Sequence, residues 1–227
     1  MNQHINLLGK SRIKIFIGEF GSGKTELAVN YSLSLVQGGH KTAVVDIDLV
    51  KPYFRTRENR ALLEKNGVIL VAPEHQLAHS DLPIMPSNLT RVIYDQDCNV
   101  IMDVGGGDSA VVLGQINQQL NEKGYEAQLV INTMRPFTNT TEGIVTMLER
   151  IERISRLKVS GFICNTNLAQ ETTAQHILRG LKTVEEVAGM LKLPINWVVV
   201  PEWLQNEVIV DYPVFVLKPY TQYPWMG

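Results

Sequence analysis

The stretch of sequence that decides the fold is Gly18-Glu19-Phe20-Gly21-Ser22-Gly23-Lys24-Thr25. It matches the pattern G-x-x-x-x-G-K-[ST], whose glycines let backbone N–H groups surround a phosphate. Residues 12–17 before it are mostly apolar and β-branched, which predicts a strand, and residues 26–36 after it place apolar side chains at helical spacing. A strand, a glycine-rich loop and a helix in this order favour phosphate binding over a glycine-rich turn that matches by chance.

The residue types in this loop predict how it would bind a nucleotide. The start of the following helix adds partial positive charge at the loop. Lys24 is expected to reach the β- and γ-phosphates and to act in catalysis, and the Thr25 hydroxyl is expected to ligate Mg²⁺. All eight loop residues, together with the next residue, Glu26, are therefore predicted to form the phosphate side of a nucleotide site.

Composition bounds the class of protein. The chain has 227 residues, a net charge of −2 and 44% hydrophobic residues, which suits one α/β domain spanning residues 1–227. A pI near 6.2 gives no sign of a broad nucleic-acid footprint. Cys98 and Cys164 lie far apart in apolar runs, which predicts buried thiols in a reducing cytoplasm rather than a disulfide. No run approaches the roughly 20 apolar residues of a membrane span, and residues 1–9 do not resemble a signal peptide.

Strands and helices are predicted to alternate along the rest of the chain. The predicted strands are nearly continuous apolar runs, at 41–45, 68–71, 99–103, 127–132, 159–164, 195–200 and 214–217. Such runs are typical of a parallel sheet covered by helices on both faces, the doubly wound α/β fold. Helices are predicted within 57–65, 87–94, 110–120, 138–155, 172–178 and 184–191. Gly180 is expected to separate the last two, with Thr183 and Glu186 as the capping box of the second.

Polar residues follow the predicted strands where ligands of such sheets bind, at the carboxyl ends. Asp103 closes an apolar strand, which predicts a carboxylate near Mg²⁺; the alternative is a cap for the glycine turn at 105–107. Asp48 is predicted to act through metal-bound water or to orient the attacking water, with Asp46 supporting it. For both, the alternative is solvation of a strand end. Asn165 and Pro201 close two further strands.

Two weaker patterns lie outside these strand ends. His75 and His79 have the i,i+4 spacing of a metal clip, but nearby prolines disfavour the helix that such a pair needs. Arg55 and Arg57 follow Asp48 and could supply a cation to the phosphates; the alternative is that both are solvated loop charges.

The ordered motifs resemble the ParA/MinD-type P-loop ATPases of the SIMIBI class, over roughly residues 12–205. After the loop come VVDID at 44–48, IMDVGGG at 101–107, ICNTN at 163–167 and VVPE at 199–202. The resemblance implies Asp48 as the switch aspartate that assists hydrolysis and as a metal-site residue, and Asp103 as the Walker B carboxylate. It implies that Asn165 reads adenine and that Pro201 and Glu202 pack beside the base. Residues 165–168 lack the N/T-K-x-D pattern of guanine readers, so ATP is expected rather than GTP.

The chain departs from that group at Glu19. Many members carry a lysine at this position that reaches the partner's nucleotide across a dimer, and Glu19 cannot supply that charge. The dimer in which that lysine crosses to the partner's nucleotide is therefore not expected, and a nucleotide-dependent homodimer of another kind stays an open alternative. Pro213, Pro219 and Pro224 exclude a long C-terminal membrane-binding helix. The two cysteines do not match the paired iron–sulfur ligands of the nitrogenase-like branch.

Two functions remain as hypotheses. The first is a Mg-ATP-dependent switch that acts on an unidentified protein partner and hydrolyses ATP slowly without it. The second is a small-molecule ligase or kinase of the cobyrinate amidase or dethiobiotin synthetase type. The sequence shows no glutaminase segment and no substantial insertion that would form an acceptor pocket, which favours the switch.

Overall fold

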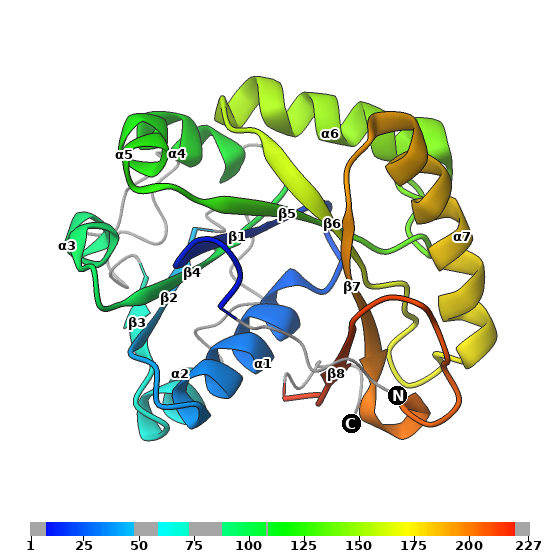
Figure 1. The fold of residues 1–227 in the computed structure, drawn as a ribbon, viewed down its shortest axis with the longest axis horizontal. Coiled ribbons are helices and arrows are strands. Elements are labelled where there is room, and N and C mark those ends of the chain that lie inside the picture. Colours follow the sequence, from blue (N-terminus) through cyan, green and yellow to red (C-terminus); the bar gives the residue numbers. More distant parts are fainter. Residues whose placement is uncertain (1–7, 48–58, 73–87, 108, 221–227) are drawn as a thin grey trace.

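Eight parallel strands form one sheet. The computed structural model describes residues 8–47, 59–72, 88–107 and 109–220. The order across the sheet is β3-β2-β4-β1-β5-β6-β7-β8 (Figure 1). The strands are β1 Ile13–Ile17, β2 Thr42–Asp46, β3 Ile69–Val71, β4 Asn99–Val104, β5 Glu126–Ile131, β6 Val159–Cys164, β7 Ile195–Pro201 and β8 Val214–Leu217. The predicted parallel sheet is therefore confirmed.

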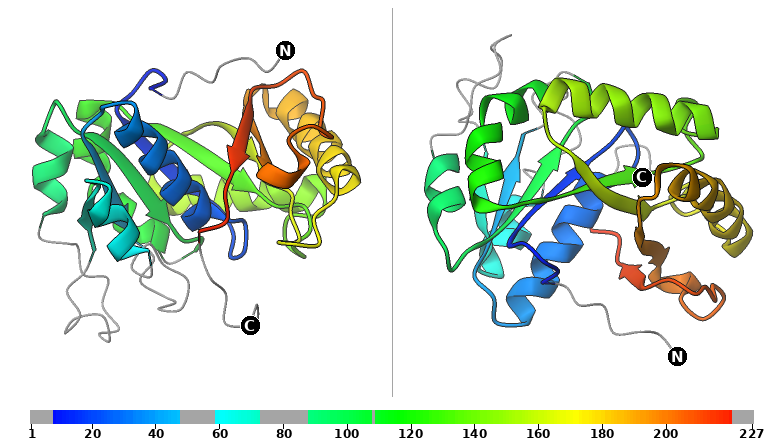
Figure 2. Two further views of the ribbon diagram at one scale, coloured as in Figure 1. Left: turned by 90° about the horizontal axis from the view of Figure 1, so that it is seen from below. Right: turned by 45° about the horizontal axis from the view of Figure 1, so that its top comes forward.

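Helices cover both faces of this sheet. One face carries α1 Lys24–Gln37 and α2 Arg60–Lys65, whose buried side chains share a cluster. The other face carries α3 Leu89–Tyr94, α4 Ser109–Gln115, α5 Asn117–Lys123, α6 Thr141–Ser155 and α7 Ala174–Leu191. Figure 2 shows α1 and α6 on opposite sides of the sheet. The arrangement is the predicted doubly wound fold.

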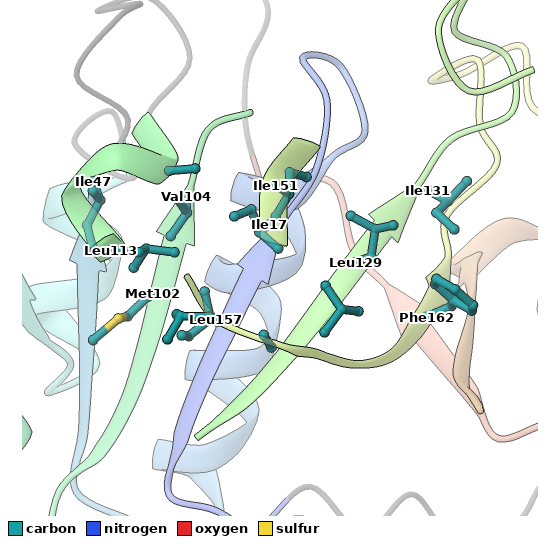
Figure 3. Packing of buried hydrophobic residues seen from close by; sticks show 14 of the residues in the cluster. Ile17, Ile47, Met102, Val104, Leu113, Leu129, Ile131, Ile151, Leu157 and Phe162 are labelled. Carbon is teal, nitrogen blue, oxygen red and sulfur yellow. The ribbon is translucent and has the colours of Figure 1, made fainter. Parts of the chain in front are cut away.

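Strand β1 is buried on both faces because its side chains alternate between the two clusters. Ile13, Ile15 and Ile17 contribute to the cluster under α3–α7, whereas Phe16 contributes to the cluster under α1. Figure 3 shows Ile17 between Val104 of β4 and Leu129 of β5. A continuous apolar run is what a strand in this position requires.

A single helix, α7, replaces the two helices predicted on either side of Gly180. Gly180 lies inside α7, and a Cβ atom at this position would come within 2.0 Å of Thr166 Oγ1. The glycine therefore permits close packing rather than ending a helix. The capping box is formed by Thr173 and His176, not by Thr183 and Glu186 as predicted.

The helix predicted at 110–120 is divided instead. Its two parts, α4 and α5, meet at Ile116, whose backbone N–H donates to the carbonyl of Leu113 at 3.2 Å. Gly114 lies where α4 approaches α6, since an added Cβ would be 3.1 Å from the carbonyl oxygen of Ile154. The close approach of these helices and the change of direction at Ile116 leave no local signal in the apolar spacing.

Candidate nucleotide site

The glycine-rich loop connects β1 to α1 at the carboxyl edge of the sheet. β1 lies between β4 and β5, so the loop lies between the two halves of the sheet. Gly21 and Gly23 have φ angles of 76° and 84°, a region that favours glycine. Neighbouring side chains also leave little space for a Cβ atom at these two glycines. A Cβ at Gly21 would lie 2.7 Å from Nε of Arg135, and one at Gly23 would lie 2.3 Å from Nδ2 of Asn165. The backbone conformation therefore favours glycine at both positions, and a side chain at either would displace the Arg135 or Asn165 group that contacts the loop.

Side chains from the ends of β5 and β6 hold the carbonyl groups of this loop. Asn165 Nδ2 donates to the carbonyl of Ser22 at 2.7 Å. Asn132 Nδ2 and Arg135 Nε both donate to the carbonyl of Gly21 at 3.1 Å. The N–H of a peptide points opposite to its carbonyl. Because these bonds hold the carbonyls of Gly21 and Ser22, the N–H groups of Ser22 and Gly23 point away from the ends of β5 and β6. The loop is thus fixed with its donors on one side.

Two donors of the loop converge on one oxygen, the carbonyl oxygen of Glu19. Lys24 is buried, and its Nζ donates to the carbonyl of Glu19 at 2.9 Å and to Ser22 Oγ at 3.4 Å. The backbone N–H of Ser22 donates to the same Glu19 carbonyl at 3.2 Å. An ammonium group and an N–H aimed at one oxygen form an arrangement that a phosphate oxygen can accept.

The side chain of Glu19 turns back to its own loop. Its Oε1 accepts a hydrogen bond from the N–H of Phe20 at 3.0 Å, and the carboxylate is half-buried. The Phe20 side chain is 49% exposed at the rim of the loop. The position that a lysine occupies in many ParA/MinD-type members therefore carries a negative charge bound to the backbone.

A second contact joins the loop to β4. The hydroxyl of Thr25 donates to Oδ2 of Asp103 at 2.6 Å. Asp103 lies near the end of β4 and pairs in register with Asp46 on β2, and both carboxylates are 1% exposed. A hydroxyl and a carboxylate are hard oxygen donors that suit Mg²⁺, which takes its remaining ligands from water and phosphate. Across residues 8–47, 59–72, 88–107 and 109–220 there is no cluster of three or more His, Cys, Asp or Glu side chains that could hold another metal ion.

A pocket opens beside the loop at the ends of β6 and β7. Its walls include Gly23, Asn165, Asn167, Val199, Pro201 and Trp203. Asn165 therefore contacts the loop and also lines the pocket, as the position of a base-reading residue requires. Glu202 begins the short 3₁₀ helix Glu202–Leu204 and is exposed; the residue of this helix that lines the pocket is Trp203. Glu26, predicted with the phosphate residues, is also at the wall of this pocket.

Several residues of the site were not predicted from the sequence. Asn132 follows β5 as Asn165 follows β6, and its Oδ1 accepts hydrogen bonds from the N–H groups of Met134 and Asn167. Its place after a strand was the signal that could have identified it. Arg135 carries no such signal, because it comes from a loop without a recognisable pattern. Trp203 directly follows the VVPE motif, and this adjacency was the signal that could have identified it.

Five residues singled out in the sequence are not described by the structure. Asp48, Arg55, Arg57, His75 and His79 are outside the residues that the structure describes. Both cysteines are buried, as predicted. Within the described part of the chain, no helix is sufficiently long and apolar to cross a membrane.

Comparison with known proteins identifies the fold. No protein-family model and no curated protein sequence matches this chain. FtsY from Mycoplasma mycoides matches with 18% identity and a TM-score of 0.54, over 88% of this chain and 61% of that one. Cell division protein FtsY from Thermotoga maritima matches with 16% identity and a TM-score of 0.55, over 88% and 65%. Signal recognition particle 54 kDa protein from Aeropyrum pernix, solved in complex with GDP, matches with 20% identity and a TM-score of 0.53, over 84% and 42%.

These likenesses show the fold and no more, because the identities are low. This chain spans less than two thirds of the length of each of these three proteins. The shared architecture is a P-loop NTPase-like α/β fold with a single parallel sheet.

Proposed function

We propose that this chain is a Mg-ATP-binding P-loop ATPase that acts as a nucleotide-dependent switch on a partner protein, on the plan of the ParA/MinD-type ATPases. The observation that carries the proposal is the contact between Thr25 and Asp103, next to the buried Lys24. It brings oxygen donors for a metal ion and a cation for phosphates together at the ends of β1 and β4.

The phosphate side of the proposal assigns a task to each of these groups. Lys24 and the N–H groups of the loop would bind the phosphates, because Lys24 Nζ and the Ser22 N–H already converge on one oxygen. Thr25 and Asp103 would hold Mg²⁺, which when bound neutralises charge on the β- and γ-phosphates. Asp48 is proposed from the sequence alone as the residue that assists hydrolysis.

The geometry of Asn165 supports ATP over GTP. Its Nδ2 gives a hydrogen to the carbonyl of Ser22, and among the hydrogen bonds of the described residues none uses its Oδ1. That oxygen can accept from the 6-amino group of adenine, whereas guanine presents an acceptor, O6, at the same position, to which only the second hydrogen of Nδ2 could donate. The Aeropyrum protein was solved with GDP, but it is only 20% identical to this chain, so its nucleotide does not decide which nucleotide this chain binds.

The glycine turn at 105–107, which follows Asp103, contacts the glycine-rich loop, and this contact supports a nucleotide-dependent switch. Gly106 follows Asp103 in this turn, and a Cβ added to it would lie 3.0 Å from the carbonyl oxygen of Gly18. The next residue, Gly107, lies against α6, where an added Cβ would be 3.1 Å from an Arg150 guanidinium nitrogen. A change at the phosphates would therefore reach the surface of α6 through adjacent contacts.

Binding of ATP and GTP, measured by calorimetry with and without Mg²⁺, tests the proposal. Wild type is expected to prefer ATP in the presence of Mg²⁺. Lys24→Ala is expected to weaken ATP binding by about 100-fold or more, because a buried charge that meets the phosphates is lost. Lys182→Ala removes an exposed lysine on α7 and serves as the matched control. Equal ATP affinity in the two variants would refute the phosphate assignment.

Partner capture tests the switch. Asp48→Ala is expected to retain Mg-ATP while hydrolysing it slowly, so it should retain a partner in ATP and release it in ADP. Light scattering of the same samples measures nucleotide-dependent self-association. Turnover that depends on a small-molecule acceptor, with no nucleotide-dependent binding of a protein, would instead identify a ligase or kinase.

A further inference from the structure

The segment after β8 is fastened to the helix that follows the glycine-rich loop. The N–H of Lys218 donates to Oδ1 of Asn30 at 2.9 Å, and its carbonyl accepts from Nδ2 of Asn30 at 2.8 Å. The N–H of Tyr220 donates to Oε1 of Glu26 at 2.6 Å. Three hydrogen bonds therefore tie the segment to the first turns of α1, toward which it runs in the left view of Figure 2.

The residues of α1 that hold this segment are buried. Glu26 and Asn30 are 7% and 6% exposed and lie one helical turn apart. Nδ2 of Asn30 also donates to Oε1 of Glu26 at 3.2 Å. A carboxylate and an amide in a buried position are costly unless hydrogen-bonded, and the backbone of the segment supplies part of that bonding. The Tyr220 side chain adds apolar packing against the cluster under α1.

The same segment forms part of the pocket next to the loop. Leu217 and Pro219 line it, as do Glu26 and Asn165. Lys218, between the two lining residues, is the residue whose backbone Asn30 binds on both sides. The position of this wall therefore depends on α1.

We infer that residues 217–220 form the apolar wall of the base site, and that Glu26 and Asn30 are positioning residues that set this wall from the helix that carries Lys24 and Thr25. This inference rests on the proposed function. Leu217 and Pro219 would bury one side of the base. No described hydrogen bond joins residues 217–220 to the loop residues 18–25. The wall should therefore contribute to nucleoside binding and not to phosphate binding.

The test compares ATP with inorganic tripolyphosphate, which has no base. The hydrogen bonds that join Glu26 and Asn30 to the backbone of Lys218 and Tyr220 are called the clamp. Asn30→Ala removes both bonds to Lys218, and Lys218→Pro removes one of them by deleting the N–H of residue 218. Both variants are expected to weaken ATP binding about threefold to tenfold, the equivalent of one or two net hydrogen bonds. Tripolyphosphate affinity should stay within about twofold of wild type, which also shows that the loop is folded.

Two controls separate the clamp from general effects. Asn121→Ala removes an asparagine of α5 whose Nδ2 likewise donates to the carbonyl four residues earlier, and it should bind both ligands as wild type does. Lys218→Ala keeps the N–H and should bind ATP more tightly than Lys218→Pro.

Each outcome decides the inference. Unchanged ATP affinity in both clamp variants would overturn it, as would an equal loss for ATP and tripolyphosphate, because the segment would then not act through the base. A wild-type protein that binds neither ligand would refute the proposed function, and the inference with it. Weaker ATP binding with intact tripolyphosphate binding supports it.

Discussion

The side-chain amide of Asn165 lies 2.7 Å from the carbonyl oxygen of Ser22, so one residue at the end of β6 both anchors the glycine-rich loop and lines the neighbouring pocket. Asn132, at the end of β5, anchors the preceding carbonyl of the loop, that of Gly21. In the proposed function, Asn165 therefore contributes to both base selection and loop conformation, whereas the direct contact of Asn132 acts on loop conformation alone.

Replacing these two asparagines separates the effects. Asn165→Ala and Asn132→Ala should each weaken tripolyphosphate binding, by about threefold to tenfold, because each frees a carbonyl of the loop. Only Asn165→Ala should also reduce the preference for ATP over GTP, measured as the ratio of the two Kd values. An unchanged ratio in Asn165→Ala would assign base recognition to other groups of the pocket.

Asp103→Asn tests the metal assignment. The side chain keeps an oxygen that can accept from the Thr25 hydroxyl, so the fold of the site should persist, but the negative charge that attracts Mg²⁺ is lost. ATP affinity in Mg²⁺ should fall toward the affinity measured in EDTA, which itself should not weaken. Calorimetry under the two conditions gives the ratio, and a variant that responds to Mg²⁺ as wild type does would place the metal elsewhere.

Two glycines of α7 should respond in opposite directions to alanine. Gly180 has Thr166 Oγ1 and Thr133 Oγ1 within 2.0 and 2.6 Å of an added Cβ, so Gly180→Ala should lower the free energy of unfolding by about 1–3 kcal/mol. Gly189 has no atom within 4 Å of an added Cβ. Gly189→Ala should raise the free energy of unfolding by about 0.5–1 kcal/mol through helix propensity alone. Urea unfolding of the pair measures both, and two changes of the same sign would contradict the packing described for α7.

The thiol of Cys164 should make stability depend on alkaline pH. Burial raises the pKa of this thiol to about 11, whereas an unfolded cysteine titrates near 8.5. The folded state keeps a proton that the unfolded state loses, so stability should fall as pH rises from about 8.5 towards 11. At pH 9.5 the loss from this group should be about 1 kcal/mol. Cys164→Ala removes this contribution, so the unfolding free energy of the variant should decline less than that of wild type between pH 7 and 9.5. An equal decline in the two proteins would contradict a raised pKa of the Cys164 thiol.

The sheet could be predicted from the sequence because strands buried on both faces are mostly apolar, as in Ile13–Ile17, where four of the five residues are apolar and Lys14 is the exception. The division at Gly180 was wrong because a glycine that ends a helix and one that admits Thr166 look alike in a single sequence. Contacts far apart in the chain decide the difference.

The same limit applies to the site. Thr25 and Asp103 could be predicted, because a motif and the end of an apolar strand identify them, and the structure brings them together. The contact of Arg135 with Gly21 and the clamp between Glu26 and Tyr220 could not, since each joins distant segments without a local pattern.

The position of β1 in the sheet has a consequence for synthesis of the chain. β1 pairs with β4 and β5, so that Ile13 lies opposite Val100 and Lys14 opposite Glu126. The strand that carries the glycine-rich loop therefore has no partner until the ribosome has passed residue 100, and gains its second partner only after residue 126. Pairings so distant in sequence form slowly and leave apolar strands exposed in the nascent chain. A nucleotide bound at the glycine-rich loop would therefore stabilise the chain only after β4 and β5 have been synthesised.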